Sequence, residues 1–366
     1  VSNELSIENL MGRNIFNLSG GEKQKIACSC VFVSGQEIIV LDEPSSNLDI
    51  SATMELRKLI KLWKEQGKTV VISEHRIYYL KGLIDRVIHL KDGNIYGEYT
   101  EEEFNKFMEK DKCKAGLRPL DLNTFPFCLS NEVKCESQFT ISDVIYSYQK
   151  GGYILKIGEI KLPQNRIIGI IGHNGAGKST FADCLCGISK NDKSVISYGG
   201  RLYYKKKKFK LCFLVMQDVN HQLFTESVED EMLLSMTQKD KNKLYNILKE
   251  LNLYSLKNMH PMSLSGGEKQ RIAIASALVS SRDFIILDEP TSGLDLFHMR
   301  MVADELKKIK SRGKSIFLIT HDYEMLLSSC DYILHLEDGK VKDSYFLDGE
   351  GIKKIKKYFI REEVSP

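Results

Sequence analysis

The stretch Ile167-Ile-Gly-Ile-Ile-Gly-His-Asn-Gly-Ala-Gly-Lys-Ser-Thr180 decides the fold of this chain. Its apolar start, Ile167 to Ile171, predicts a buried strand, and Phe181 to Gly187 favour a short helix. Between them lies G-x-x-x-x-G-K-S, a phosphate-binding loop in its required context of strand, glycine turn and helix. Glycines let backbone N–H groups point at phosphate oxygens, and the helix start adds a positive dipole end. Lys178 would reach the β- and γ-phosphates, and the Ser179 hydroxyl would bind Mg²⁺.

The composition indicates an ordinary globular protein that is long enough for two cores. The chain has 366 residues, of which 42% are hydrophobic and 28% are charged. Because the net charge is only +3, no overall field points to nucleic acid. The sequence has no run of 18 apolar residues, so no membrane-spanning helix is predicted. The nine cysteines include no C-x-x-C pair, which favours reduced thiols in a cytosolic protein.

An internal repeat organises the chain. The segment L-S-G-G-E-K-Q occurs at 18–24 and at 264–270, and L-D-E-P occurs at 41–44 and at 287–290. Each pair is separated by 246 residues, as are His75 and His321. We therefore predict two copies of one domain. The same shift would put a first phosphate loop before residue 1, so we expect a chain without roughly the first half of copy one, and with exposed strand edges there.

We assign residues 1–99 to the end of the first copy, 100–137 to a linker and 138–366 to a complete second copy. Strands that alternate with helices predict a mainly parallel α/β sheet. Predicted core strands are 37–41, 69–72, 86–90, 167–171, 213–216, 284–287, 315–319 and 332–336, with an antiparallel flank at 139–145 and 153–160. The lysine run 205–208 reads as a solvated hairpin loop, with a nucleic-acid contact as the alternative.

Two adjacent carboxylates, Asp288 and Glu289, end the apolar strand that begins near Phe284. The carboxyl ends of parallel strands border the ligand crevice, and neighbouring side chains point to opposite sides. The two acids must therefore do different work. Asp288 suits Mg²⁺, directly or through water, and Glu289 suits the polarising of an attacking water. The alternative is a simple acidic turn before Pro290.

Together these motifs resemble those of the ATP-binding-cassette (ABC) ATPases. L-S-G-G-E-K-Q shortly before L-D-E-P is that family's signature, and the resemblance covers nearly the whole chain apart from the linker. It implies a P-loop NTPase of ABC type, with a mainly parallel core sheet, an antiparallel flank and a helical subdomain. It also implies ATP and Mg²⁺ as cofactors. Each ATP would lie between the phosphate loop of one domain and the signature of another, through pairing within the chain or in a dimer.

Carried onto this sequence, the resemblance implies Glu289, His321 and Gln217 as catalytic residues, and Ser179, Asp288 and Gln217 as Mg²⁺ ligands. The implied nucleotide-binding residues are Tyr148, Gly172, His173, Asn174, Gly175, Ala176, Gly177, Lys178, Ser179 and Thr180, with Ser19, Gly20 and Gly21 from the first copy. Core packing remains the alternative for Tyr148 and for His321. The first copy has no phosphate loop, so at most one complete site is expected.

The segment Gln217-Asp-Val-Asn-His-Gln-Leu-Phe-Thr-Glu-Ser-Val228 is similar to the energy-coupling-factor type with two fused ATPase domains. That resemblance implies a peripheral protein on the cytoplasmic face of the membrane, which imports a vitamin or metal ion. Its partners would be a transmembrane scaffold subunit and a substrate-binding membrane subunit, and no nucleic acid is expected. A groove beside Gln217 would accept helices of the scaffold. For Leu223 and Phe224, core packing is the alternative.

Two other classes share these motifs. Soluble tandem ATPases that act on ribosomes usually carry a long charged helical linker, and 100–137 is short and mixed in composition. DNA-repair and chromosome ATPases carry a long coiled coil between phosphate loop and signature, and no sustained heptads occur between Gly177 and Leu264. The transporter reading is therefore preferred, and the ribosome-associated class is kept as its alternative.

Overall fold

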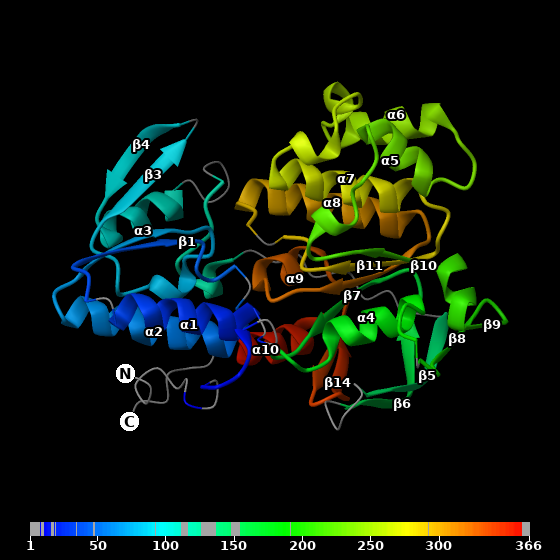
Figure 1. Cartoon of the computed structure of the whole chain (residues 1–366), viewed down its shortest axis with the longest axis horizontal. Helices are drawn as coiled ribbons and strands as arrows, with labels where there is room; N and C mark the ends of the chain where they lie inside the picture. The colour runs from blue at the N-terminus through cyan, green and yellow to red at the C-terminus, as the bar shows by residue number, and fades with distance from the viewer. Residues whose placement is uncertain are drawn as a thin grey trace. The chain divides into compact units, whose positions relative to one another are not determined.

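The computed structural model forms two compact units, which are described separately: residues 1–126 with 292–297, and residues 127–291 with 298–366. Figure 1 shows the elements of both units along the chain. The residues that the structure describes are 8, 11–15, 18, 20–33, 35–46, 48–91, 93–110, 116–125, 137–147, 154–190, 192–291 and 293–360.

The second unit is built on a six-stranded sheet in the order β10-β11-β12-β7-β13-β14. Neighbouring strands are parallel except for β14, which runs antiparallel to β13. Every residue of β7 and of β12 is buried, as expected for central parallel strands with both faces covered. The bounds are β7 Ile167–Ile171, β10 Cys212–Val215, β11 Phe284–Asp288, β12 Ser315–Ile319, β13 Tyr332–Glu337 and β14 Lys340–Phe346.

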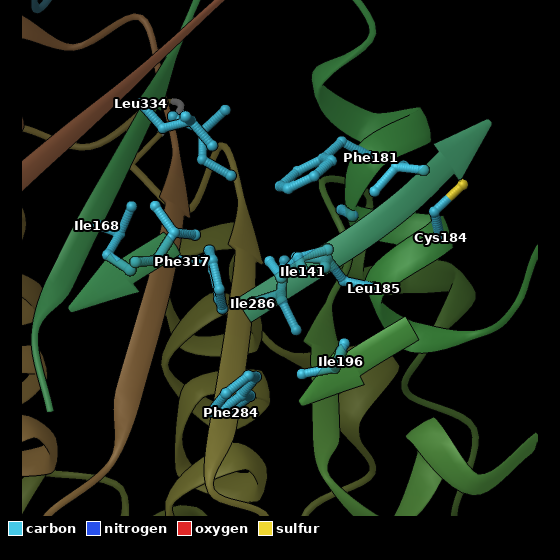
Figure 2. Close-up of a cluster of buried hydrophobic side chains, with 14 of the residues drawn as sticks. Ile141, Ile168, Phe181, Cys184, Leu185, Ile196, Phe284, Ile286, Phe317 and Leu334 are labelled. Carbon is cyan, nitrogen blue, oxygen red and sulfur yellow. The ribbon is translucent and has the colours of Figure 1, made fainter. Parts of the chain in front are cut away.

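An antiparallel sheet in the order β6-β5-β8-β9 forms the predicted flank. Its strands are β5 Gln138–Ser147, β6 Ile154–Pro163, β8 Val195–Tyr198 and β9 Arg201–Tyr204. The main core lies between this sheet, helix α4 (Lys178–Cys186) and the six-stranded sheet. In Figure 2, Ile141 of the flank and Phe181 of α4 lie on one side of this core, and Phe317 of the large sheet lies on the other. The helix that follows the phosphate loop thus packs against both sheets through apolar side chains.

Helices α5 (Val228–Ser235), α6 (Lys241–Glu250) and α7 (Gly266–Val279) pack against one another and form the predicted helical subdomain. The remaining helices of this part of the chain are α8 Leu296–Ser311, α9 Tyr323–Ser329 and α10 Gly349–Phe359. Short 3₁₀ helices connect several elements: η5 Lys205–Lys210, η6 Val219–His221, η7 Tyr254–Leu256 and η8 Pro261–Ser263. Among the described residues, no helix combines the length and the apolar character that crossing a bilayer requires.

The first unit contains two small sheets. Strands β1 (Ile38–Asp42) and β2 (Thr69–Ser73) are parallel, and β3 (Val87–Lys91) and β4 (Asn94–Tyr99) are antiparallel. The helices are α1 Gly20–Val33, α2 Ile50–Glu65 and α3 Glu101–Lys110, with 3₁₀ helices η3 Tyr78–Leu80 and η4 Leu122–Thr124. The fully buried Trp63 of α2 lies in a cluster with Ile39 and Tyr79.

Part of the predicted linker is regular structure that packs within the first unit. Helix α3 occupies the first third of 100–137, and its Phe104 is 1% exposed. The Phe107 ring stacks on Tyr99 of β4 with centroids 5.1 Å apart. Charge-rich composition concealed this helix, because its apolar residues are few and lie on one face.

The sequence repeat is visible in the strand pairing. β1 and β2 correspond to β11 and β12, and β3 and β4 correspond to β13 and β14. In the second unit β7 pairs with both β12 and β13, whereas in the described part of the first unit no strand lies between β2 and β3. The two units also differ in which side chains are covered: Leu90 is 66% exposed, and its counterpart Leu336 is fully buried. The exposed edges expected of the first copy are present.

The prediction of a solvated hairpin loop for the lysine run was wrong in two respects. The run lies in the 3₁₀ helix η5, and the strands on either side of it, β9 and β10, belong to different sheets. Lys208 does not face solvent, because η5 turns its side chain inward, where it is fully buried and ion-paired with Asp192. Its Nζ also donates to the Cys184 carbonyl at 2.8 Å and to the Ser194 hydroxyl at 2.5 Å. Lys205, Lys206 and Lys207 are exposed, as the sequence predicts.

Candidate nucleotide site

The phosphate-loop backbone requires glycine at its first position. A Cβ on Gly172, where φ is 154°, would come within 2.3 Å of the Leu336 carbonyl oxygen of neighbouring strand β13. At the other end Gly177, with φ 98°, lies in the left-handed region and leads into α4. The loop is thus a tight curl between β7 and α4, which points the first turn of α4 toward the carboxyl edge of the sheet.

Lys178 is held over this curl. It is 7% exposed, and its Nζ donates to the carbonyls of Gly172 at 2.9 Å and His173 at 3.0 Å. The ammonium is therefore positioned by the backbone of the same loop that it would share with a phosphate chain. Ala176 is buried inside the curl, and Gly175 lies exposed at its outer side.

Ser179, Asp288 and Gln217 line one pocket of about 300 Å³. The Ser179 hydroxyl hydrogen-bonds to the Asp288 carboxylate. Burial raises the pKa of Asp288, although the Ser179 hydrogen bond and the nearby Lys178 ammonium act in the opposite direction. A hydroxyl, a carboxylate and an amide at one pocket are donors that suit Mg²⁺, which prefers oxygen ligands and takes few of them from protein. The three predicted ligands are thus brought together.

Three polar residues of this pocket were missed by the sequence analysis: Asp183, Asp218 and His221. Asp183 lies one helical turn after Ser179, and that spacing alone could have indicated it. Burial, followed by the Asp288 charge, raises the pKa of Asp183. The Nε2 of His221 lies 3.2 Å from the Asp218 carboxylate.

Glu289 and His321 lie together beside the phosphate loop. Glu289 adopts a left-handed backbone, φ 48°, which turns its side chain away from the direction of Asp288. Its Oε2 accepts hydrogen bonds from the Thr320 hydroxyl at 3.1 Å and the His321 N–H at 3.4 Å. The His321 Nε2 lies 3.1 Å from the Asn174 Oδ1 of the phosphate loop and 3.8 Å from the Glu289 Oε1. The Glu289 carboxylate, the His321 imidazole and Asn174 of the phosphate loop therefore lie in contact, and we call them the connected group.

The corresponding pair in the first unit has the same backbone geometry. Glu43 is also left-handed, with φ 42°, and the His75 Nε2 lies 3.5 Å from its Oε1. The Glu43 N–H donates to Ser73 at 2.8 Å, as the Glu289 N–H donates to Ile319 at 2.9 Å. The L-D-E-P segment thus adopts the same local turn in both copies.

In the segment after Gln217, the adjacent residues Leu223 and Phe224 differ in exposure. Leu223 is buried, whereas Phe224 is 71% exposed. The buried Glu231 of α5 holds the loop, because its Oε2 accepts from the N–H of Phe224 at 3.1 Å and of Thr225 at 3.2 Å. The core-packing alternative therefore holds for Leu223 alone, and the Phe224 side chain is exposed to solvent.

The second copy of the signature begins a helix. Ser265 is the N-cap of α7 and forms a capping box with Glu268, whose Oε2 accepts from the Ser265 hydroxyl at 2.7 Å. In the first copy Gly20 and Gly21 lie in the first turn of α1. Ser19 and Tyr148 lie outside the described residues. Thr180 lies in the first turn of α4.

Comparison with known proteins identifies the family. The family model described as ABC transporter matches residues 155–292. One relative, from Treponema denticola, carries the provisional name ABC transporter ATP-binding protein; it is 40% identical over 93% of this chain, which spans 71% of that protein. A relative from Clostridium perfringens with the same kind of name is 30% identical over 93% of this chain. The chain spans 68% of that protein.

Two solved structures resemble the chain in different ways. The archaeal ribosome recycling factor aABCE1, in complex with stalk protein aP1, is 26% identical over 98% of this chain and 70% of its own, with a TM-score of 0.71. The cbiO1 protein of Clostridium perfringens, part of the ABC transporter complex cbiONQ, is 27% identical over 61% of this chain and 96% of its own, with a TM-score of 0.50. With its phosphate loop, paired carboxylates and signature in ABC-type order, the chain belongs to the ABC transporter ATP-binding family of ATPases.

Proposed function

We propose that this chain is the ATP-hydrolysing subunit of an importer of the energy-coupling-factor type, with two ABC domains that clasp ATP between them. The catalytic part rests on the connected group of Glu289, His321 and Asn174 beside the phosphate loop. The membrane part rests on Phe224, which is exposed in the Gln217 loop and positioned by the buried Glu231. The protein would lie at the cytoplasmic face of the membrane, against a transmembrane scaffold and a substrate-binding subunit.

Hydrolysis would use the geometry of the second unit. The phosphates of ATP would lie against the loop N–H groups and the Lys178 ammonium, with Tyr148 against the adenine and the first-copy Ser19, Gly20 and Gly21 closing the site. Glu289 would accept the proton of the attacking water, oriented by the Thr320 and His321 donors on its Oε2. His321 would contact the γ-phosphate. Ser179, Asp288 and Gln217 would hold Mg²⁺, which when bound neutralises charge on the phosphate oxygens.

The catalytic assignment is tested with a matched pair of variants. Glu289→Gln should retain ATP binding and lower the hydrolysis rate about 100-fold or more, because the proton acceptor is lost while the shape is kept. The control is Glu43→Gln, the equivalent residue of the first copy, which has no part in the proposed site, and it should leave the rate unchanged. Phosphate release and nucleotide affinity are the measurements. Undiminished hydrolysis by the Glu289→Gln variant would falsify its role as the base.

The membrane assignment is tested by replacing Phe224 with Ala. Loss of this exposed ring should weaken co-purification with membrane subunits while ATP hydrolysis stays unchanged, since the side chain has no part in the site. Ile145→Ala, which removes an exposed apolar side chain of the antiparallel flank, serves as the control. If Phe224→Ala co-purifies with the membrane subunits as fully as Ile145→Ala does, the groove beside Gln217 is not the contact.

A second candidate is a tandem ATPase that acts on ribosomes. It is favoured by the similarity to the archaeal recycling factor over 98% of this chain, against 61% for cbiO1. Sedimentation of cell extracts decides between the two. Transporter function predicts the chain in the membrane fraction and its absence from ribosomal subunits. Salt-resistant sedimentation with ribosomal subunits, in the presence of a non-hydrolysable ATP analogue, would favour the second candidate.

A further inference from the structure

A strongly basic surface lies on the antiparallel flank, away from the nucleotide site. Residues 193–217 contain seven lysines and arginines and no aspartate or glutamate, although the whole chain has a net charge of only +3. Six of the seven are exposed, and we call them the basic patch: Lys193, Arg201, Lys205, Lys206, Lys207 and Lys210. The charge is therefore concentrated at one place in the fold.

The basic patch lacks neutralising partners. Within the described part of the chain, none of its six cations forms an ion pair with a carboxylate. Asp192, the acid that precedes Lys193, is buried, pairs with Lys208 and accepts a hydrogen bond from the Ser194 hydroxyl. The Lys207 ammonium instead lies 4.4 Å from the centre of the Tyr204 ring and donates to its hydroxyl at 2.9 Å. The exposed charge is thus available to an external anion.

Apolar side chains are interleaved with these cations. Strand β9 is the edge of the sheet, and η5 follows it and contacts it (Figure 1). Because side chains alternate along a strand, Tyr203 packs toward the core while Leu202 and Tyr204 face outward, 60% and 43% exposed. Phe209 of η5 is 44% exposed. Such isolated apolar groups beside cations suit insertion at a charged interface.

We propose that the basic patch, with Leu202, Tyr204 and Phe209, binds the anionic headgroups of a lipid bilayer. Lysines near a negatively charged membrane surface are attracted to it, and aliphatic and aromatic side chains enter the boundary between headgroups and acyl chains. Single-stranded RNA fits less well, because bases need free aromatic faces for stacking. Here Lys207 lies over the Tyr204 ring, and Leu202 offers no π surface. The contact goes beyond the proposed transport function, because it requires lipid alone and no scaffold protein.

Co-sedimentation of the full chain with protein-free vesicles tests this contact. Vesicles of equal parts phosphatidylcholine and phosphatidylglycerol should bind the chain, and phosphatidylcholine vesicles should not. Binding should weaken as salt increases. The triple variant Lys206→Glu, Lys207→Glu, Lys210→Glu should bind at least about 100-fold less tightly, since each lysine contributes about a factor of five near an anionic surface. Leu202→Ser combined with Phe209→Ser should weaken binding about tenfold and leave its salt dependence in place.

The control variant is Lys353→Glu, Lys354→Glu, Lys357→Glu on α10, which makes the same change in charge where Glu350 and Asp343 lie nearby. It should bind vesicles like the unmodified chain, and thermal unfolding verifies that all variants are folded. Equal vesicle binding by the unmodified chain and the patch variant would overturn the proposal, as would equal loss in the α10 control. Binding of a single-stranded RNA oligonucleotide that only the patch variant loses, without vesicle binding, would make this surface a nucleic-acid contact instead. None of these outcomes bears on the ATPase measurements with Glu289→Gln.

Discussion

At the scale of single residues, the nucleotide site shows a conflict between stability and binding. Asp288 lies at the end of a buried strand, where burial raises its pKa, and the neighbouring Asp183 has a raised pKa for the same reason. A carboxyl whose folded-state pKa is raised holds its proton more tightly in the folded than in the unfolded chain. Stability is therefore lost as the pH rises from the usual carboxyl range through the raised pKa. The ionised carboxylates therefore lower the stability of the folded chain, which is typical of a binding site.

This conflict predicts the behaviour of Asp288→Asn. In the absence of nucleotide at pH 8, the free energy of unfolding of the variant should exceed that of the unmodified chain by about 1 kcal/mol, because a half-buried charge is removed. At a pH well below the usual carboxyl range, where this carboxyl is protonated in the folded and the unfolded chain alike, the gain should nearly vanish. ATP binding in the presence of Mg²⁺ should be weakened. Urea unfolding at the two pH values measures the difference, and an equal gain at both would show that charge is not the cause.

At the scale of elements, a buried ion pair ties the flank to α4. Lys208 of η5 donates to the carbonyl of Cys184 near the end of this helix, and to Ser194 beside β8. Its ammonium pairs with Asp192, and both side chains are buried. The helix that follows the phosphate loop is thus fixed at its other end by charge. Removing one partner should leave an uncompensated buried charge.

Replacement of Lys208 by Met should therefore lower the free energy of unfolding by about 3–5 kcal/mol. The double variant Lys208→Met, Asp192→Leu should recover much of this loss, because no charge then remains buried. Urea denaturation followed by the circular dichroism of the chain gives both values. If the double variant is as unstable as the single one, packing of the lysine stem, and not its charge, holds the two elements together.

At the scale of the whole molecule, the two copies of the repeat differ in what covers their strands. Leu90 and Leu336 occupy the same place in the repeat, on β3 and β13, yet one is 66% exposed and the other is fully buried. In the second unit the covering elements are α4 and the antiparallel flank, as Figure 2 shows around Leu334 and Phe317. A leucine at this place in the repeat therefore contributes more to the free energy of unfolding in the second unit than in the first.

The comparison predicts different costs for one substitution. Leu336→Ala should destabilise its unit by about 2–5 kcal/mol, because it leaves a cavity in a packed core. Leu90→Ala should change stability by less than about 0.5 kcal/mol, because an exposed side chain loses little on truncation. Hydrogen exchange of the peptides that contain β13 and β3 follows each unit separately. Similar exchange losses in both variants would mean that Leu90 is covered in solution.

Much of the second unit was predictable from local patterns. Strands β7 and β12 have the predicted bounds, because a run of apolar residues between turn signals is typical of a central parallel strand. The phosphate loop, the strand end at Asp288 and Glu289 and the helix start at Ser265 follow from short motifs whose geometry is local. The turn around Glu43 repeats that of Glu289 for the same reason.

Other features were decided by tertiary structure, because they depend on residues distant in sequence. Nothing local distinguishes Lys208 from the three lysines before it, and only the position of Asp192 and Ser194 makes it the buried one. Leu223 and Phe224 are adjacent and both apolar, yet only one faces the core. The chain by itself determined which loops can form and which strands are central; burial and charge pairing were determined by the elements that pack around them, since both depend on what surrounds a side chain in space.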